Sequence, residues 1–221
     1  MTNREIHELA DQLTSLGSLA MAFGRVDRIT YHPDGVTPES DTDHTVMLGW
    51  LACAMAARLY PNLDLGFVAQ FALVHDAPEV YAGDTPTLRI DQTERAAKAG
   101  RERAAIKKLA LEFDESLAWF PDTIICYEYQ RLPEARFVRA LDKVLPLLTD
   151  LLNCAIHLSR EEMDAGEFRA MLTRQREDIK QYAGEFTALI DLHTEMTERV
   201  CNLPAMQEGL PTLQPVEVIS D

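Results

Sequence analysis

Cysteine is scarce in this chain of 221 residues, and its spacing matches no functional cysteine motif. The four cysteines stand far apart and none belongs to a CxxC pair; they are Cys53, Cys126, Cys154 and Cys201. This pattern excludes a zinc knuckle, a CxxC redox centre and the disulfide framework of small secreted proteins. We expect four reduced thiols that act as small, mostly buried apolar side chains.

Basic residues are also few, because 21 lysines and arginines face 36 aspartates and glutamates and leave a formal net charge of −15. Such a surface disfavours nonspecific binding to nucleic-acid polymers and to anionic membranes. It does not exclude a small anionic substrate, since a bound divalent cation can reverse the local field. We therefore expect neither nucleic acid nor a membrane as a partner.

Long apolar runs are missing as well. The longest, at about residues 44–60, includes His44 and Arg58 and falls short of the roughly 20 residues that span a bilayer. The N-terminal segment MTNREIHELA is charged and lacks the apolar core of a signal peptide. These features predict a soluble protein of the cytoplasm.

Strand signals are scarce, whereas helical spacing of apolar residues is found along most of the chain. The sequence has no sustained apolar–polar alternation and no Asn-Gly or Asp-Gly turn between two β-branched runs. Apolar periodicity predicts helices over residues 4–23, 43–60, 65–76, 91–113, 116–130 and 133–157. The predicted fold class is therefore all-α.

The C-terminal part of the chain is expected to differ from the rest. Ser159 and Glu162 form a capping-box pattern, which predicts one long polar helix to about residue 201. The predicted organisation is one domain over 1–158, a long helix over 159–201 that packs on it or on a partner subunit, and a loose tail over 202–221.

The strongest chemical signal is the segment VHDAPEVYAGDTPT, where an apolar helix ends in His75 and Asp76. Burying an imidazole and a carboxylate together is costly unless they pair or bind a metal. Glu79 and Asp84 follow, at a bend that a proline and a glycine favour. Four ionisable groups among apolar neighbours predict a site. The simpler interpretation is a buried His–Asp pair with capping acids.

A second candidate is His44, at the start of the helix predicted over 43–60. Thr42 or Asp43 is a plausible N-cap, so His44 lies on the first turn of an apolar helix. A histidine in this position is more often a helix-terminal residue than a ligand. His44 gains meaning only in combination with other residues.

A third candidate is Asp142, in the helix predicted over 133–157. It shares an inward-facing row with Val138, Leu145 and Leu152, so an ionised carboxylate there needs a partner. Pro146 removes the backbone hydrogen bond to residue 142 and predicts a kink beside it. The alternative is a solvent-facing aspartate beside Lys143.

Together, His44, His75, Asp76 and Asp142 supply the donors of one divalent cation. Imidazole with carboxylate suits Mn²⁺, Fe²⁺, Co²⁺ or Zn²⁺, with positions left open for water and a phosphate oxygen. Residue spacing alone leaves open whether the three segments meet.

The order of these four residues resembles the HD superfamily of metal-dependent phosphohydrolases. Three segments carry the resemblance: PESDTDHTVMLGWLA, VHDAPEVYAGDTPT and YEYQRLPEARFVRALDKV. They are most similar to the YfbR-type 5′-deoxynucleotidases and their eukaryotic relatives, and the similarity covers about residues 5–155. The resemblance implies an all-helical HD domain in which His44, His75, Asp76 and Asp142 bind the metal.

The resemblance also implies roles for other residues. Glu79 matches the acid that orients or deprotonates the attacking water, and Asp84 matches the acid that positions water or handles the leaving oxygen. An arginine before the first histidine binds phosphate in the subgroup, for which Arg25 and Arg28 are candidates. Lys143 is a third candidate for substrate binding. The chain departs from the subgroup in lacking a tryptophan beside that arginine and in having a longer segment at 31–40.

The expected activity is that of a metal-dependent 5′-nucleotidase that converts deoxynucleoside 5′-monophosphates to nucleoside and phosphate. The alternatives that keep the same site are a deoxynucleoside triphosphate triphosphohydrolase and another nucleotide phosphodiesterase. A noncatalytic relic is a further alternative, which the presence of all four ligands and both acids disfavours. The C-terminal helix, together with the resemblance to dimeric relatives, predicts a homodimer.

Overall fold

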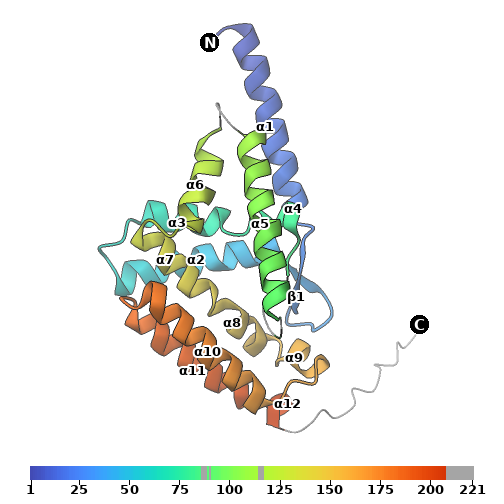
Figure 1. Ribbon diagram of the computed structural model, residues 1–221, viewed down its shortest axis with the longest axis vertical. Helices are drawn as coiled ribbons and strands as arrows, with labels where there is room; N and C mark the ends of the chain where they lie inside the picture. Colours follow the sequence, from blue (N-terminus) through green and yellow to red (C-terminus); the bar gives the residue numbers. More distant parts are fainter. Residues whose placement is uncertain (86–88, 90, 114–116, 208–221) are drawn as a thin grey trace, which may run out of the picture.

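The computed structural model describes residues 1–85, 89, 91–113 and 117–207, and most of these are helical (Figure 1). The predicted all-α class is confirmed. The helices are α1 (Asn3–Phe23), α2 (Asp41–Leu59), α3 (Leu65–Val74), α4 (Glu79–Ala82), α5 (Gln92–Glu112), α6 (Trp119–Glu128), α7 (Pro133–Asp142), α8 (Leu145–Leu152), α9 (Ile156–Arg160), α10 (Ala165–Ala183), α11 (Thr187–Cys201) and α12 (Pro204–Gln207). Within the described ranges, no helix is long and apolar enough to cross a membrane.

The centre of the molecule is an apolar core that α2, α3 and α7 form by packing on one another. Phe71 of α3 and Phe137 of α7 are almost fully buried in it, and burial of a side chain of this size contributes about 1.5–3 kcal/mol. α10 and α11 cover this core with Ile179 and Leu189. The core therefore fixes the ends of α2, α3 and α7, where the candidate ligands stand.

Residues 27–40 form a β-hairpin, which the sequence pattern did not predict. Its strands, β1 (Asp27–Tyr31) and β2 (Pro38–Ser40), pair antiparallel, and a three-residue strand is too short for alternation to be recognised. In the connecting loop the Asp34 carboxylate accepts two backbone N–H groups, and Gly35 adopts a φ of 69°, which glycine tolerates without steric cost. The hairpin carries Arg28 and Glu39 toward the candidate site.

The helix predicted over 133–157 is interrupted beside Asp142, as the position of Pro146 led us to expect. α7 ends at Asp142 and α8 begins at Leu145, with Pro146 in its first turn, where the missing N–H costs no helical hydrogen bond. Because the break changes the helical register, the inward row predicted for a continuous helix ends early. Val138 and Leu145 are buried, but Leu152 is 55% exposed.

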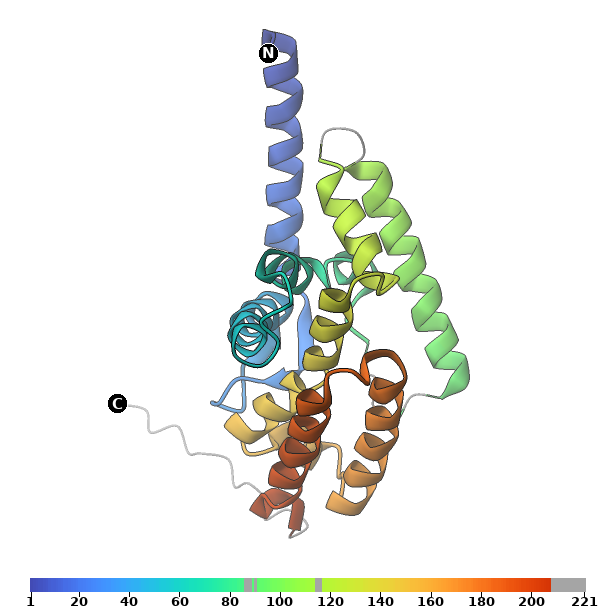
Figure 2. The same ribbon diagram turned by 90° about the vertical axis from the view of Figure 1, so that its left-hand side faces the viewer.

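The segment predicted as one long helix over 159–201 is divided in the structure. Ser159 lies inside α9, and the helix that follows is capped by Asp164, whose side chain accepts the backbone N–H of Glu167. α10 ends at Ala183 with Gly184 as its C-cap, and α11 runs back beside it (Figure 2). Both helices turn apolar faces inward, so the hairpin buries surface that a single long helix would expose. α12 lies in the predicted tail, and residues 208–221 fall outside the described ranges.

Candidate metal centre

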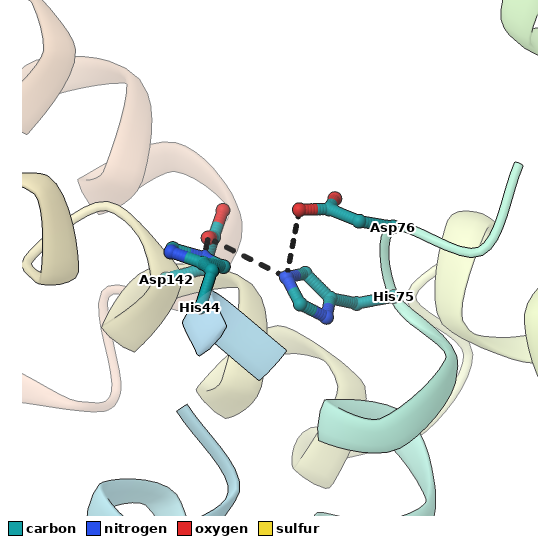
Figure 3. Close-up of side chains that lie close together, drawn as sticks. All are labelled: His44, His75, Asp76 and Asp142. Carbon is teal, nitrogen blue, oxygen red and sulfur yellow. Dashed lines mark hydrogen bonds and ion pairs between the residues drawn. The ribbon is translucent and has the colours of Figure 1, made fainter. Parts of the chain in front are cut away.

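The four predicted ligands lie together at the ends of three helices (Figure 3). His44 is in the first turn of α2, His75 and Asp76 directly follow α3, and Asp142 is the last residue of α7. One donor atom from each residue lies within 4.8 Å of the others. The N-cap of α2 is neither Thr42 nor Asp43; it is Ser40, which forms a capping box with Asp43.

The hydrogen bonding of His75 leaves its Nε2 atom available to bind a metal. Nδ1 lies 2.9 Å from the carbonyl oxygen of Ala72, which fixes the proton on Nδ1 and the lone pair on Nε2. Nε2 is buried, has no hydrogen bond among the described residues, and lies 3.0 Å from Oδ2 of Asp76 and 3.8 Å from Oδ1 of Asp142. An orphaned imidazole nitrogen facing two carboxylates fits a transition-metal ligand.

His44 has a carboxylate on each side of its ring. Nε2 lies 2.9 Å from Oδ1 of Asp142, and Nδ1 lies 3.5 Å from Oε1 of Glu39. Burial opposes protonation of His44, but the hydrogen bonds to Asp142 and Glu39 outweigh it and raise the pKa of His44 to about 9. Glu39 was not among the predicted site residues. A carboxylate behind a ligating histidine orients the ring and raises its basicity.

The raised pKa of His44 predicts that metal affinity depends on pH. A ligating histidine must be neutral, so below about pH 9 a metal ion bound by His44 would displace a proton from it. We expect the affinity for Mn²⁺ or Co²⁺ to rise about tenfold per pH unit between pH 6 and pH 8. Isothermal titration calorimetry in buffers of different ionisation enthalpy measures both affinity and released protons. A constant affinity with no proton release would contradict this prediction.

Glu39→Gln tests the carboxylate behind His44. The substitution keeps the side-chain shape but removes the charge that faces Nδ1, and we expect metal affinity to fall about 10–100-fold. Thr149→Val is the matched control, because the Thr149 hydroxyl lies 3.4 Å from the other Glu39 oxygen. Metal titration measures the affinity of both variants. An equal loss of affinity in the two would mean that Glu39 contributes only through packing.

A group of acidic residues adjoins the four predicted ligands. Glu79, in the first position of α4, is 7% exposed. Burial and the neighbouring carboxylates Asp76, Asp84 and Asp41 raise the pKa of Glu79 to about 10, with Arg28 opposing the shift. In the metal-free protein Glu79 is therefore protonated at neutral pH.

Three of the predicted ligands, His75, Asp76 and Asp142, line a cleft of about 900 Å³, which is large enough for a nucleotide-sized ligand. Arg28, Asp84 and Lys143 line it, whereas Arg25 is exposed and lies outside the lining. Lys143 Nζ lies 2.7 Å from Oδ2 of Asp142. Burial opposes ionisation of Asp142, but Lys143 and the histidines hold its pKa well below the ordinary value.

Other cations line the same cleft and were not predicted from the sequence. They are Arg89, Arg95, Lys98, Arg139 and Arg174. Arg95 and Lys98 belong to α5, which corresponds to the helix predicted over 91–113. Their spacing on a surface-like helix gave no sign that one face borders a cleft, since that depends on how α5 packs. An acidic chain thus has a cleft with several basic residues.

A comparison with protein families matches residues 24–183 to a family described as HD domain. The match extends through α10, beyond the domain boundary predicted at residue 158. Two relatives are similar to this chain in sequence, at low identity. A 5′-deoxynucleotidase of Vibrio parahaemolyticus is 26% identical over 154 residues, and one of Vibrio vulnificus is 25% identical over 154 residues. Each alignment covers 65% of this chain and 73% of the relative.

Solved structures show the same fold. A protein from Magnetospirillum magnetotacticum, described as a predicted metal-dependent phosphohydrolase, superposes with a TM-score of 0.62 at 24% identity and covers 85% of this chain and 96% of its own. A conserved hypothetical protein from Pyrococcus furiosus superposes with a TM-score of 0.53 at 20% identity, over 85% of this chain and 98% of its own.

Proposed function

The chain belongs to the HD-domain family and is a metal-dependent phosphohydrolase, and on this premise we propose that it is a 5′-nucleotidase acting on deoxynucleoside 5′-monophosphates. The products are nucleoside and phosphate. The observation that carries the proposal is the cluster of His44, His75, Asp76 and Asp142 next to a nucleotide-sized cleft, which Arg28 and Lys143 line. The Vibrio 5′-deoxynucleotidases support the choice of substrate.

The four clustered residues would hold one divalent ion of Mn, Fe, Co or Zn. Such an ion lowers the pKa of a bound water and neutralises charge on a phosphate oxygen. Arg28 and Lys143 face the cleft and would bind the phosphate oxygens, since cations of this kind fix a phosphate dianion. They would thereby hold the phosphorus atom next to the four clustered residues.

Two carboxylates would move the protons. Glu79 lies three residues after Asp76 and is buried beside the carboxylates of Asp41 and Asp76, and it would orient the attacking water and accept its proton. Asp84 lines the cleft after Gly83 ends α4 and would position the water or protonate the leaving oxygen. General acid–base catalysis of this kind needs no covalent nucleophile.

A triphosphohydrolase on the same site is the second candidate. Arg95 and Lys98 of α5 line the cleft together with Arg28 and Lys143, and a triphosphate would use more cations than a monophosphate. This reaction would release a nucleoside and triphosphate from a deoxynucleoside triphosphate. The distinction between the two candidates is therefore one of product.

Product analysis tests the proposal. The protein is stripped of metal, reloaded with Mn²⁺ or Co²⁺, and incubated with matched deoxynucleoside mono- and triphosphates before the products are separated by chromatography. We expect nucleoside and phosphate from the monophosphates. Triphosphate release with untouched monophosphates would favour the second candidate, and turnover of neither would exclude both substrates.

A further inference from the structure

A second group of carboxylates adjoins the four clustered residues and shares one of them. Asp41, Asp76 and Glu79 each offer an oxygen atom, and these atoms lie within 4.8 Å of one another. Asp41 is the first residue of α2, three positions before His44, and Glu79 opens α4, three positions after Asp76. The same helix ends that bring the first group together therefore also assemble this one.

Two oxygens of this group are buried without a hydrogen bond. The Asp41 side chain is 0% exposed and the Glu79 side chain is 9% exposed. Among the described residues, Oδ2 of Asp41 and Oε2 of Glu79 have no hydrogen-bond partner. A buried carboxylate that is ionised needs a positive charge beside it, so ionised Asp41 and Asp76 require a cation.

Arg28 supplies that cation from β1. Its Nη1 atom lies 2.9 Å from Oδ1 of Asp41, 2.9 Å from Oδ2 of Asp76 and 3.8 Å from Oε2 of Glu79. One guanidinium nitrogen thus contacts all three carboxylates, and the side chain is 14% exposed. A guanidinium remains charged throughout the accessible pH range.

We propose that Asp41, Asp76 and Glu79 form a second cation site, which Arg28 fills with its guanidinium in place of a second divalent metal ion. Arg28 thereby limits the centre to one metal ion. Three carboxylates without an imidazole prefer a hard ion such as Mg²⁺ or Mn²⁺. The inference rests on the proposed metal centre, because Asp76 belongs to both groups of residues.

The experiment counts bound Mn²⁺ per chain, by equilibrium dialysis with metal analysis and by electron paramagnetic resonance. We expect one ion in the wild-type protein and two in Arg28→Gln and Arg28→Ala, with an exchange-coupled signal from the pair. Arg28→Lys keeps a positive charge and is expected to bind one. The double variant Arg28→Gln/Asp41→Asn lacks a ligand of the second site and is also expected to bind one.

Each outcome separates this inference from the proposed metal centre. One Mn²⁺ in the wild type and one in both neutral variants would overturn the second site and leave the centre intact. Two ions in the wild type would overturn the role of Arg28, and none would overturn the centre itself. Arg28→Gln keeps most of the side-chain volume, so it decides the question if Arg28→Ala does not fold.

Discussion

Asp76→Ala is expected to abolish metal binding and turnover together. Asp76 lies 3.0 Å from Nε2 of His75 and 2.9 Å from Nη1 of Arg28, and it belongs to both groups of candidate ligands. A catalytic metal contributes several kcal/mol of transition-state stabilisation, so its loss should lower kcat/KM by about 10³-fold or more. Metal analysis and steady-state kinetics on the same preparation measure both effects, and His75→Ala should behave alike.

The control for this variant is Asp191→Ala, which removes an exposed carboxylate from α11. It should keep wild-type metal content and turnover. If Asp76→Ala retains its metal while turnover is lost, Asp76 acts in catalysis without being a ligand. If it retains both, the four clustered residues do not form the working metal centre.

Glu79→Gln is expected to retain the metal and lose turnover by about 10²–10⁴-fold, the range typical of a general acid or base. The amide keeps the length of the side chain but cannot accept the proton of the attacking water. Glu195→Gln, at an exposed position of α11, is the matched control and should be fully active. Full activity of Glu79→Gln would exclude Glu79 as the base.

The pKa of Glu79 gives a second readout, which separates catalysis from folding. In the metal-free protein this pKa is about 10, against an ordinary value of 4.5, so between these pH values the folded state holds a proton that the unfolded state has released. Stability from this residue is therefore fully present below about pH 4.5 and is lost as pH rises toward 10. Metal-free Glu79→Gln should unfold no more easily than the parent at pH 8 in a urea titration.

The sequence was sufficient to predict the group of four because its chemistry is local. His75 and Asp76 stand at the end of an apolar helix, and Asp142 lies close to a proline that breaks one, so these three residues were conspicuous in their own segments. His44 was not, and it joined the group only through the resemblance to the HD superfamily. No single segment determines the distances between these residues at the ends of α2, α3 and α7, and only the structure shows them. These distances depend on how the core packs, and the apolar pattern of the sequence does not determine that packing.

Asp41 and Glu39 were missed for the opposite reason. Asp41 stands among helix-capping residues, where an acid is ordinary, and only the position of Arg28 on a short hairpin gives it a partner. The division of the C-terminal segment was missed because helical periodicity continues on both sides of Gly184. The apolar faces of α10 and α11 are equally compatible with one long helix until their packing on the core is known.

Because the four predicted ligands stand at the ends of three separate helices, a bound metal would also cross-link these helices reversibly and stabilise the folded state. His44 and Asp142 are 98 residues apart, and a ligand present at 100 times its dissociation constant stabilises the folded chain by about 2.7 kcal/mol. A change of this size in the free energy of unfolding alters the steady-state abundance of a protein in the cell, because proteases degrade the unfolded fraction. The supply of metal would thus affect both the lifetime of the protein in the cell and its rate of turnover.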